Sequence, residues 1–152
     1  MSVALILDSG PLGNITRRPG QSSHTDAFRL WVRNRIADGV LIIVPEIVDY
    51  EVRRELVRAG LTASVARLNL FLETIDYLPI TTPAMRHAAE LWAQARNAGW
   101  ATADPKALDG DVILAAQATT LAMTVDEVIV VTENVAHLSR YVNAQQWTDV
   151  VI

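Results

Sequence analysis

The sequence predicts an α/β protein with three layers (α/β/α) built around a parallel sheet of about five strands. One observation is that short apolar runs, such as residues 3–7 (VALIL) and 40–44 (VLIIV), show no in–out alternation. Strands of this kind are buried on both faces, as in a parallel sheet covered by helices. The other is that amphipathic segments of helical period separate these runs, which is the order that parallel strands require.

The predicted elements follow from these patterns and from the glycines and prolines that bound them. We expect strands at residues 3–7, 40–44, 77–80, 127–132 and 147–152. We expect helices at residues 26–37, 45–59, 62–73, 83–98, 112–123 and, as a short helix, 135–141. The polar, Gly- and Pro-containing segment 13–24 and the segment 100–106 are predicted to be loops.

Length and composition indicate one globular domain over residues 1–152, because just over half of the residues are apolar and a fifth are charged. The chain has no cysteine, which excludes disulfides, zinc–thiolate sites, iron–sulfur clusters and thiol catalysis. This composition is consistent with the reducing cytoplasm. We find no signal peptide and no run near the roughly 18 apolar residues of a membrane helix, so no membrane association is expected.

The net charge of −4 and the pI of about 5.3 argue against a protein that coats nucleic acid through bulk charge. The charge is uneven, however. Residues 1–75 contain nine Arg and eight acidic residues, whereas residues 76–152 contain four basic and nine acidic residues. The first half therefore has either a local basic face or ordinary solvated arginines, at Arg17, Arg18, Arg53, Arg54 and Arg58.

Acidic and amide side chains gather at the predicted carboxyl edge of the sheet, where ligand crevices of parallel sheets lie. Asp8 follows the first strand directly, and Asn134 follows the fourth strand behind Thr132. Asp111 lies at the start of the helix that leads into the fourth strand. Glu51 lies about two turns into the helix after the second strand, beside core positions, where a polar side chain requires a partner.

Four segments around these residues resemble the PIN domain family and, in length and arrangement, the VapC-type toxins of bacterial toxin–antitoxin pairs. They are "LILDSGPL", "PEIVDYEVRREL", "LDGDVILAAQA" and "VIVVTENVAHL". Each segment alone is weak evidence, but all four occur in the family's order and at about its spacing, over nearly the whole chain. The resemblance implies an endoribonuclease that hydrolyses RNA phosphodiesters with one or two Mg²⁺ or Mn²⁺ ions.

The resemblance also implies the metal ligands. Asp8, Asp111 and Asn134 would bind metal directly or through water, and Glu51 would bind metal or water and orient the nucleophile. The chemistry has an independent basis, because clustered carboxylates repel one another and take up protons unless a cation neutralises them. Oxygen ligands suit Mg²⁺ or Mn²⁺, and such an ion lowers the pKa of bound water.

The two aspartates of "LDGDVILAAQA" have two interpretations. Both suit the start of a helix, because an Asp caps it and negative charge there is favoured by the helix dipole. Our hypothesis is that Asp109 caps the helix, with a role as an auxiliary ligand left open, and that Asp111 binds metal. The hydroxyls of Ser9 and Thr132 are expected to lie next to the metal ligands and to support the site without binding the metal.

The other candidates also have structural alternatives. Asp8 could simply end a strand, Glu51 could pair with Arg54, and Asn134 could cap the next helix. Asn134 stands where the family more commonly has Asp, and this reduces the negative charge of the site.

Candidate RNA contacts are fewer. Arg17 and Arg18, in the long polar segment 13–24, would contact RNA phosphates or be solvated. Trp100 is a candidate for base stacking, although packing in a core or interface explains it equally. The three histidines, which have no metal-ligand spacing, are interpreted as structural or surface residues: His24, His87 and His137.

Other function classes fit less well. A phosphatase with Asp8 as nucleophile would have a second Asp where this chain has Gly10, and a receiver domain needs a lysine after a late strand, whereas the only lysine is Lys106. The remaining rival is a PIN-like module that has weak or no activity and acts by binding RNA or protein. The resemblance further implies a homodimer and a cognate antitoxin that inserts a segment into the active-site groove, with the helix at 62–73 as one candidate contact surface.

Overall fold

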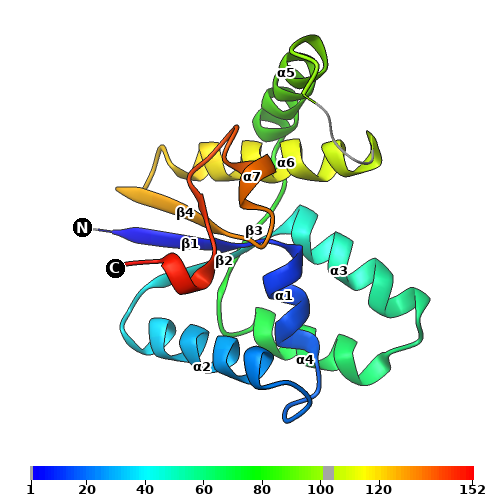
Figure 1. Ribbon diagram of the computed structural model, residues 1–152, viewed down its shortest axis with the longest axis vertical. Helices are drawn as coiled ribbons and strands as arrows, with labels where there is room; N and C mark the ends of the chain where they lie inside the picture. Colours follow the sequence, from blue (N-terminus) through cyan, green and yellow to red (C-terminus); the bar gives the residue numbers. More distant parts are fainter. Residues whose placement is uncertain (1, 101–104) are drawn as a thin grey trace.

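A five-stranded parallel sheet, in the order β3-β2-β1-β4-β5, forms the centre of the computed structural model, which describes residues 2–100 and 105–152 (Figure 1). Every neighbouring pair of strands is parallel. The predicted α/β/α fold class with five parallel strands is therefore confirmed. The strands are β1 (Val3–Leu7), β2 (Leu41–Pro45), β3 (Asp76–Leu78), β4 (Glu127–Val131) and β5 (Ala144–Gln145).

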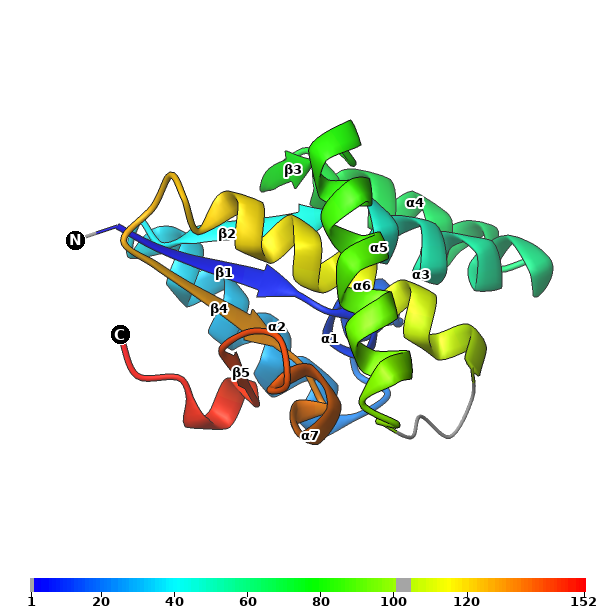
Figure 2. The same cartoon turned by 90° about the horizontal axis from the view of Figure 1, so that it is seen from above.

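Helices cover both faces of the sheet. In Figure 1, α5 and α6 lie above it and α2 and α4 lie below it, and in Figure 2 α6 crosses over β1 and β2. Helices α1 and α3 begin directly after β1 and β2, at the carboxyl edge. The helices are α1 (Ser9–Thr16), α2 (Ser23–Ala37), α3 (Glu46–Arg58), α4 (Thr62–Leu72), α5 (Thr82–Asn97), α6 (Pro105–Leu121) and α7 (Val135–Leu138).

The central strands β1, β2 and β4 are buried on both faces, as their lack of alternation predicts. Phe28 of α2 and Leu114 of α6 are almost fully buried on helices that cover opposite faces of the sheet. In residues 2–100 and 105–152 we find no helix that is both long and apolar enough to cross a membrane.

The prediction of a loop from residue 13 is wrong for its first residues, because α1 begins immediately after β1. The Asp8 carboxylate caps this helix by accepting a hydrogen bond from the Ser9 N–H at 2.7 Å. Pro11 falls in the first turn, where its missing N–H costs nothing. Leu12 and Ile15 then bury the inner face of the helix in the core, which outweighs the low helix propensity of its glycines.

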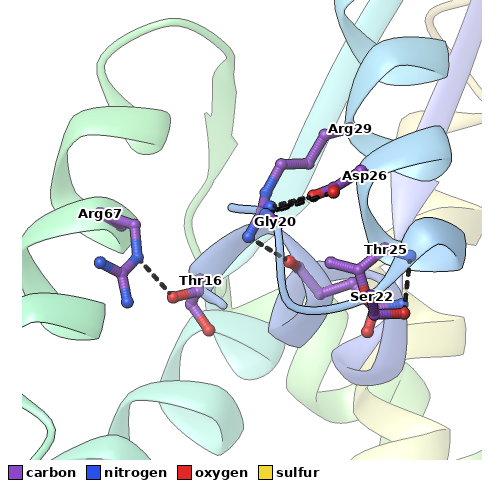
Figure 3. Close-up of polar contacts among 8 residues, drawn as sticks. Thr16, Gly20, Ser22, Thr25, Asp26, Arg29 and Arg67 are labelled. Atoms are coloured by element: carbon purple, nitrogen blue, oxygen red, sulfur yellow. Dashed lines mark hydrogen bonds and ion pairs between the residues drawn. The ribbon is translucent and has the colours of Figure 1, made fainter. Parts of the chain in front are cut away.

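The connection from α1 to α2 is short and tied down at both ends (Figure 3). The backbone N–H of Gly20, at a φ of 85°, donates to both carboxylate oxygens of Asp26 at 3.2 Å. Asp26 also pairs with Arg29 at 3.1 Å. At the other end, Arg67 of α4 donates to the carbonyl oxygen of Thr16 at 2.7 Å. The polar segment is therefore an ordered connection rather than a long free loop.

Two further predictions need correction. The fifth strand is Ala144–Gln145 and not residues 147–152, because Trp147 turns into a 3₁₀ turn (Trp147–Asp149) and packs against other aromatic rings. The helix predicted from residue 112 begins at Pro105, since Pro is favourable in a first helical turn. Asp109 is therefore inside α6 and does not cap it. The predicted loop at 100–106 lies partly outside the described residues.

Candidate active site

Three carboxyl groups from three different elements converge at the carboxyl edge of the sheet. Asp8 follows β1, Glu51 comes from α3 and Asp111 comes from α6. The negative charge of Asp8 raises the pKa of both other carboxyl groups, and that of Glu51 also raises the pKa of Asp111. The structure therefore brings together the three acidic residues that the sequence singled out.

Asp8 is the most rigidly held of the three. Its Oδ1 accepts from the Ser9 N–H at 2.7 Å, and its Oδ2 accepts from the Thr132 hydroxyl at 2.8 Å. Thr132, only 1% exposed, in turn accepts a hydrogen bond from the backbone N–H of Asn134 at 2.8 Å. Burial raises the pKa of Asp8 more than these hydrogen bonds lower it, and the nearby charge of Glu133 raises it further. The result is a buried carboxylate with a fixed orientation.

Replacing Thr132 with Val is expected to lower the free energy of unfolding by about 1–3 kcal/mol, because the buried Asp8 loses a hydrogen-bond donor and the new side chain has the same shape. Urea denaturation of the two proteins measures this change. Thr119→Val is the matched control, since the exposed Thr119 hydroxyl bonds only to the Ala115 carbonyl of its own helix. Equal losses in the two variants would contradict a supporting role for Thr132.

Glu51 is held by one hydrogen bond and lies close to Gly110. Its Oε1 accepts from the Ser9 hydroxyl at 3.3 Å, and its Oε2 would lie 2.7 Å from a Cβ placed on Gly110. Burial is the largest cause that raises the pKa of Glu51. Arg54 lowers that pKa and is the smallest of its causes, and the Arg54 guanidinium lies over the Tyr50 ring, 5.1 Å from its centroid. No ion pair joins Glu51 to Arg54 in the described structure, so the alternative of a surface pair is not what the structure shows.

Among the three carboxyl groups of the site, Asp111 has the most clearly shifted pKa. Burial, followed by the charges of Asp8 and Glu51, raises the pKa of Asp111 to about 6. Asp109 lies on a different face of α6, because two residues along a helix correspond to a rotation of about 200°. Asp109 is exposed and lines a groove between α5 and α6 that includes Trp92, so the structure does not bring it to the three carboxyl groups.

An aromatic cluster borders the site beside Asp111. The charge of Asp111 contributes to the raised pKa of Tyr141, after burial of that hydroxyl. Trp100 packs edge-on against Tyr141 at 5.8 Å between ring centroids, and the Arg140 guanidinium lies 5.6 Å from the Trp100 ring. Trp100 is 38% exposed, so part of its ring stays accessible near the carboxylates.

Two residues after β4 complete this edge. Asn134 is exposed, and its side-chain Nδ2 lies 3.2 Å from Nδ1 of His137 rather than in contact with the carboxylates. Sequence reasoning missed Glu133, whose carboxyl oxygen lies 3.1 Å from the position of a Cβ on Gly10 and whose charge raises the pKa of Asp8. The signal was present, because Glu133 follows a buried strand almost as directly as Asp8 does.

The arginines in the first half of the chain differ in their surroundings. Arg17 lines a groove of about 440 Å³ that also includes Glu51, next to the carboxylates. Arg18 is exposed. Arg53 and Arg58 form ion pairs with carboxylates of α3 at 3.0 and 2.9 Å, which neutralises part of the basic face expected from composition.

The donor set suits a divalent cation, although no group of three or more Asp, Glu, His or Cys side chains in residues 2–100 and 105–152 is arranged to hold an ion as it stands. Asp8, Glu51 and Asp111 are partly desolvated, raise one another's pKa and have no ion-pair partner within the described part of the chain. A cation relieves such repulsion. Carboxylate oxygens are the ligands that Mg²⁺ and Mn²⁺ prefer.

Comparison with known proteins identifies a matching family model and structures with a similar fold. A family model, the PIN domain, matches residues 7–141. The fold resembles VapBC2 from Rickettsia felis bound to a promoter DNA fragment, with a TM-score of 0.73 and 15% identity over 95% of this chain and 98% of that chain. It also resembles FitAcB from Neisseria gonorrhoeae, with a TM-score of 0.69 and 18% identity over 96% and 99% of the two chains. DNA-bound VapBC from Salmonella typhimurium gives a TM-score of 0.65 and 17% identity over 95% and 98%. No curated protein sequence gives a significant match.

Proposed function

Because this chain belongs to the PIN domain family, we propose that it is a Mg²⁺- or Mn²⁺-dependent endoribonuclease and the toxin of a type II toxin–antitoxin pair. The observation that carries the proposal is the convergence of Asp8, Glu51 and Asp111 at the carboxyl edge of the sheet. The fold shared with VapBC and FitAcB structures supports the toxin assignment.

In this proposal, Asp8, Glu51 and Asp111 hold the cation, with Asn134 as a further ligand directly or through water. Bound there, the cation would polarise a phosphoryl oxygen and lower the pKa of a bound water. The residues of the chain supply the positioning. Thr132 and the Ser9 N–H fix the Asp8 carboxylate, and the Ser9 hydroxyl holds Glu51, which orients the attacking water.

The groove beside Glu51 supports a path for the RNA backbone. Arg17 lies in its lining and provides a phosphate contact, with Arg18 exposed next to it. The exposed part of Trp100, which packs against Tyr141, offers a stacking surface. A cognate antitoxin that occupies the groove would block this path, and a homodimer would place two such sites in one particle.

Cleavage of RNA by the purified protein tests the proposal. Total RNA, which contains transfer, ribosomal and messenger species, is incubated with Mg²⁺ or Mn²⁺ and, separately, with EDTA. We expect cleavage with metal only, and a loss on the order of 10²–10³-fold in Asp8→Asn because this variant lacks one carboxylate. Asp109→Asn is the matched control and should cleave as the wild type does.

Two results would overturn the nuclease assignment. Cleavage that survives both EDTA and Asp8→Asn would contradict a metal-dependent nuclease site built on Asp8. Intact RNA in every reaction, together with RNA binding that Asp8→Asn leaves unchanged, would identify the chain as a PIN-like binding module instead.

A further inference from the structure

A second cavity, of about 240 Å³, lies beside the carboxylates. It is bounded by α1, α2, the end of β4 and the Trp147–Asp149 turn. Thr132 and Glu133 form part of its wall, and these residues also contact or influence Asp8. Whatever occupies this cavity therefore lies immediately next to the site of the proposed cleavage.

One wall of the cavity is aromatic. Trp147 packs against Phe28 and Trp31, with ring centroids 5.8 and 5.7 Å apart, so its indole is held in place by the core. The exposed His24 ring lies 6.0 Å from Trp147 at an interplanar angle of 52°. Trp147 and His24 both line the cavity, which gives a flat ligand two ring surfaces to contact.

Two carboxamides line the same space. Asn14 is only 8% exposed, and Arg29 fixes its backbone by donating to its carbonyl oxygen at 3.1 Å. The Asn14 side-chain amide makes no hydrogen bond to any residue that the structure describes. The polar atoms of this amide stay accessible from the cavity, so a ligand there can bond to them in place of water. Gln146 is exposed and also lines the cavity.

The charge and size of the cavity select among ligands. Its lining contains the carboxyl group of Glu133 and, among the residues placed by the structure, no Arg or Lys, so a phosphate is disfavoured. The volume is below the roughly 300–1,000 Å³ of pockets for drug-sized ligands. A single uncharged planar ring with donors and acceptors on its edge fits these features, and a nucleobase is such a ring.

We propose that this cavity binds one base of the RNA next to the scissile phosphate, and that it contributes to the choice of cleavage site. This inference rests on the proposed ribonuclease function. The ring contacts Trp147 and His24, and the amides of Asn14 and Gln146 bond to the base edge. The Glu133 carboxylate accepts hydrogen bonds only, so it would pair with a donor on the base edge, either an amino group of adenine, cytosine or guanine or the N3–H of uracil.

Titration with uncharged nucleosides tests the cavity without requiring cleavage. Adenosine, cytidine, guanosine and uridine are added separately, in EDTA, while the side-chain amide signals of Asn14 and Gln146 are followed by NMR. We expect shifts of these signals with at least one of the four nucleosides. Gln146→Ala should weaken binding roughly three- to tenfold, the effect of one hydrogen bond, and Gln21→Ala, at an exposed position outside the cavity, should not.

A second measurement separates this inference from the proposed function. The bases that flank cleavage sites are determined by sequencing RNA ends produced by wild type, Gln146→Ala and Gln21→Ala. A base preference relaxed only in Gln146→Ala supports the cavity. Normal cleavage with an unchanged preference, and no nucleoside-induced shifts, overturns the cavity but leaves the ribonuclease standing. If the protein binds nucleosides but cleaves no RNA, the base site stands and the proposed ribonuclease function is overturned.

Discussion

Replacing Asp111 with Asn is expected to abolish metal-dependent RNA cleavage and, at the same time, to raise the free energy of unfolding of the metal-free protein near neutral pH. Burial of Asp111, followed by the charges of Asp8 and Glu51, raises its pKa to about 6. A pKa of 3.8 in the unfolded chain and about 6 in the folded chain corresponds to about 3 kcal/mol of destabilisation of the charged form by burial and repulsion together. Solvent screening at this partly exposed site reduces the expected gain to about 1 kcal/mol.

The pH dependence of this gain has a defined sign. Because the folded state binds the Asp111 proton more tightly than the unfolded state, the wild-type carboxyl is most favourable below its unfolded pKa of 3.8 and loses this advantage as pH rises through about 6. Urea denaturation in EDTA should therefore show the gain of Asp111→Asn near neutral pH and almost none near about pH 4. Asp109→Asn, two positions away on the exposed face, should change stability little at either pH. A stability loss in Asp111→Asn would contradict electrostatic repulsion at this site.

Replacing Gly110 with Ala is expected to reduce RNA cleavage by about tenfold to a hundredfold while leaving stability equal or higher. The added Cβ would lie 2.7 Å from Oε2 of Glu51, so the Glu51 carboxylate must move. The helix itself favours the change, since Ala in a helix interior is better than Gly by about 1 kcal/mol. Cleavage rates and urea denaturation measure the two effects separately.

A double-mutant cycle with Glu51→Gln controls this prediction. If Gly110 acts by leaving room for Glu51, then Gly110→Ala should add almost nothing once Glu51→Gln is present. Gly13→Ala is a matched control for helix propensity, because a Cβ there meets nothing within 4 Å. Additive losses in the double mutant would show that Gly110 affects cleavage by another route.

The central fold was predictable because buried parallel strands leave an unmistakable pattern, as in residues 3–7 and 127–131. The errors lie where tertiary contacts override local preference. The glycines and Pro11 of α1 suggested a loop, but the Asp8 cap and the burial of Leu12 make a helix there. Trp147 suggested a strand, but packing against Phe28 turns the chain.

Part of the candidate site was also predictable from the sequence. Asp8 and Glu51 follow strands whose ends meet at one edge, so topology alone brings them near each other. The difference between Asp109 and Asp111 depended on where α6 begins, because a helix that starts at Pro105 places them on opposite faces. Glu133 follows β4 closely enough to be a candidate, but its approach to Asp8 also depends on the open space at Gly10, which the sequence does not show.

Binding of Mn²⁺ to the purified protein tests the carboxylate site most directly, because it depends on neither the RNA nor the cleavage reaction. Electron paramagnetic resonance of free Mn²⁺ gives the affinity of wild type, Asp8→Asn, Asp111→Asn and Asp109→Asn. The site described above predicts binding to wild type and Asp109→Asn, and a loss of at least about tenfold in both other variants. No Mn²⁺ binding to wild type, or equal binding by all four proteins, would contradict a metal site built from Asp8, Glu51 and Asp111.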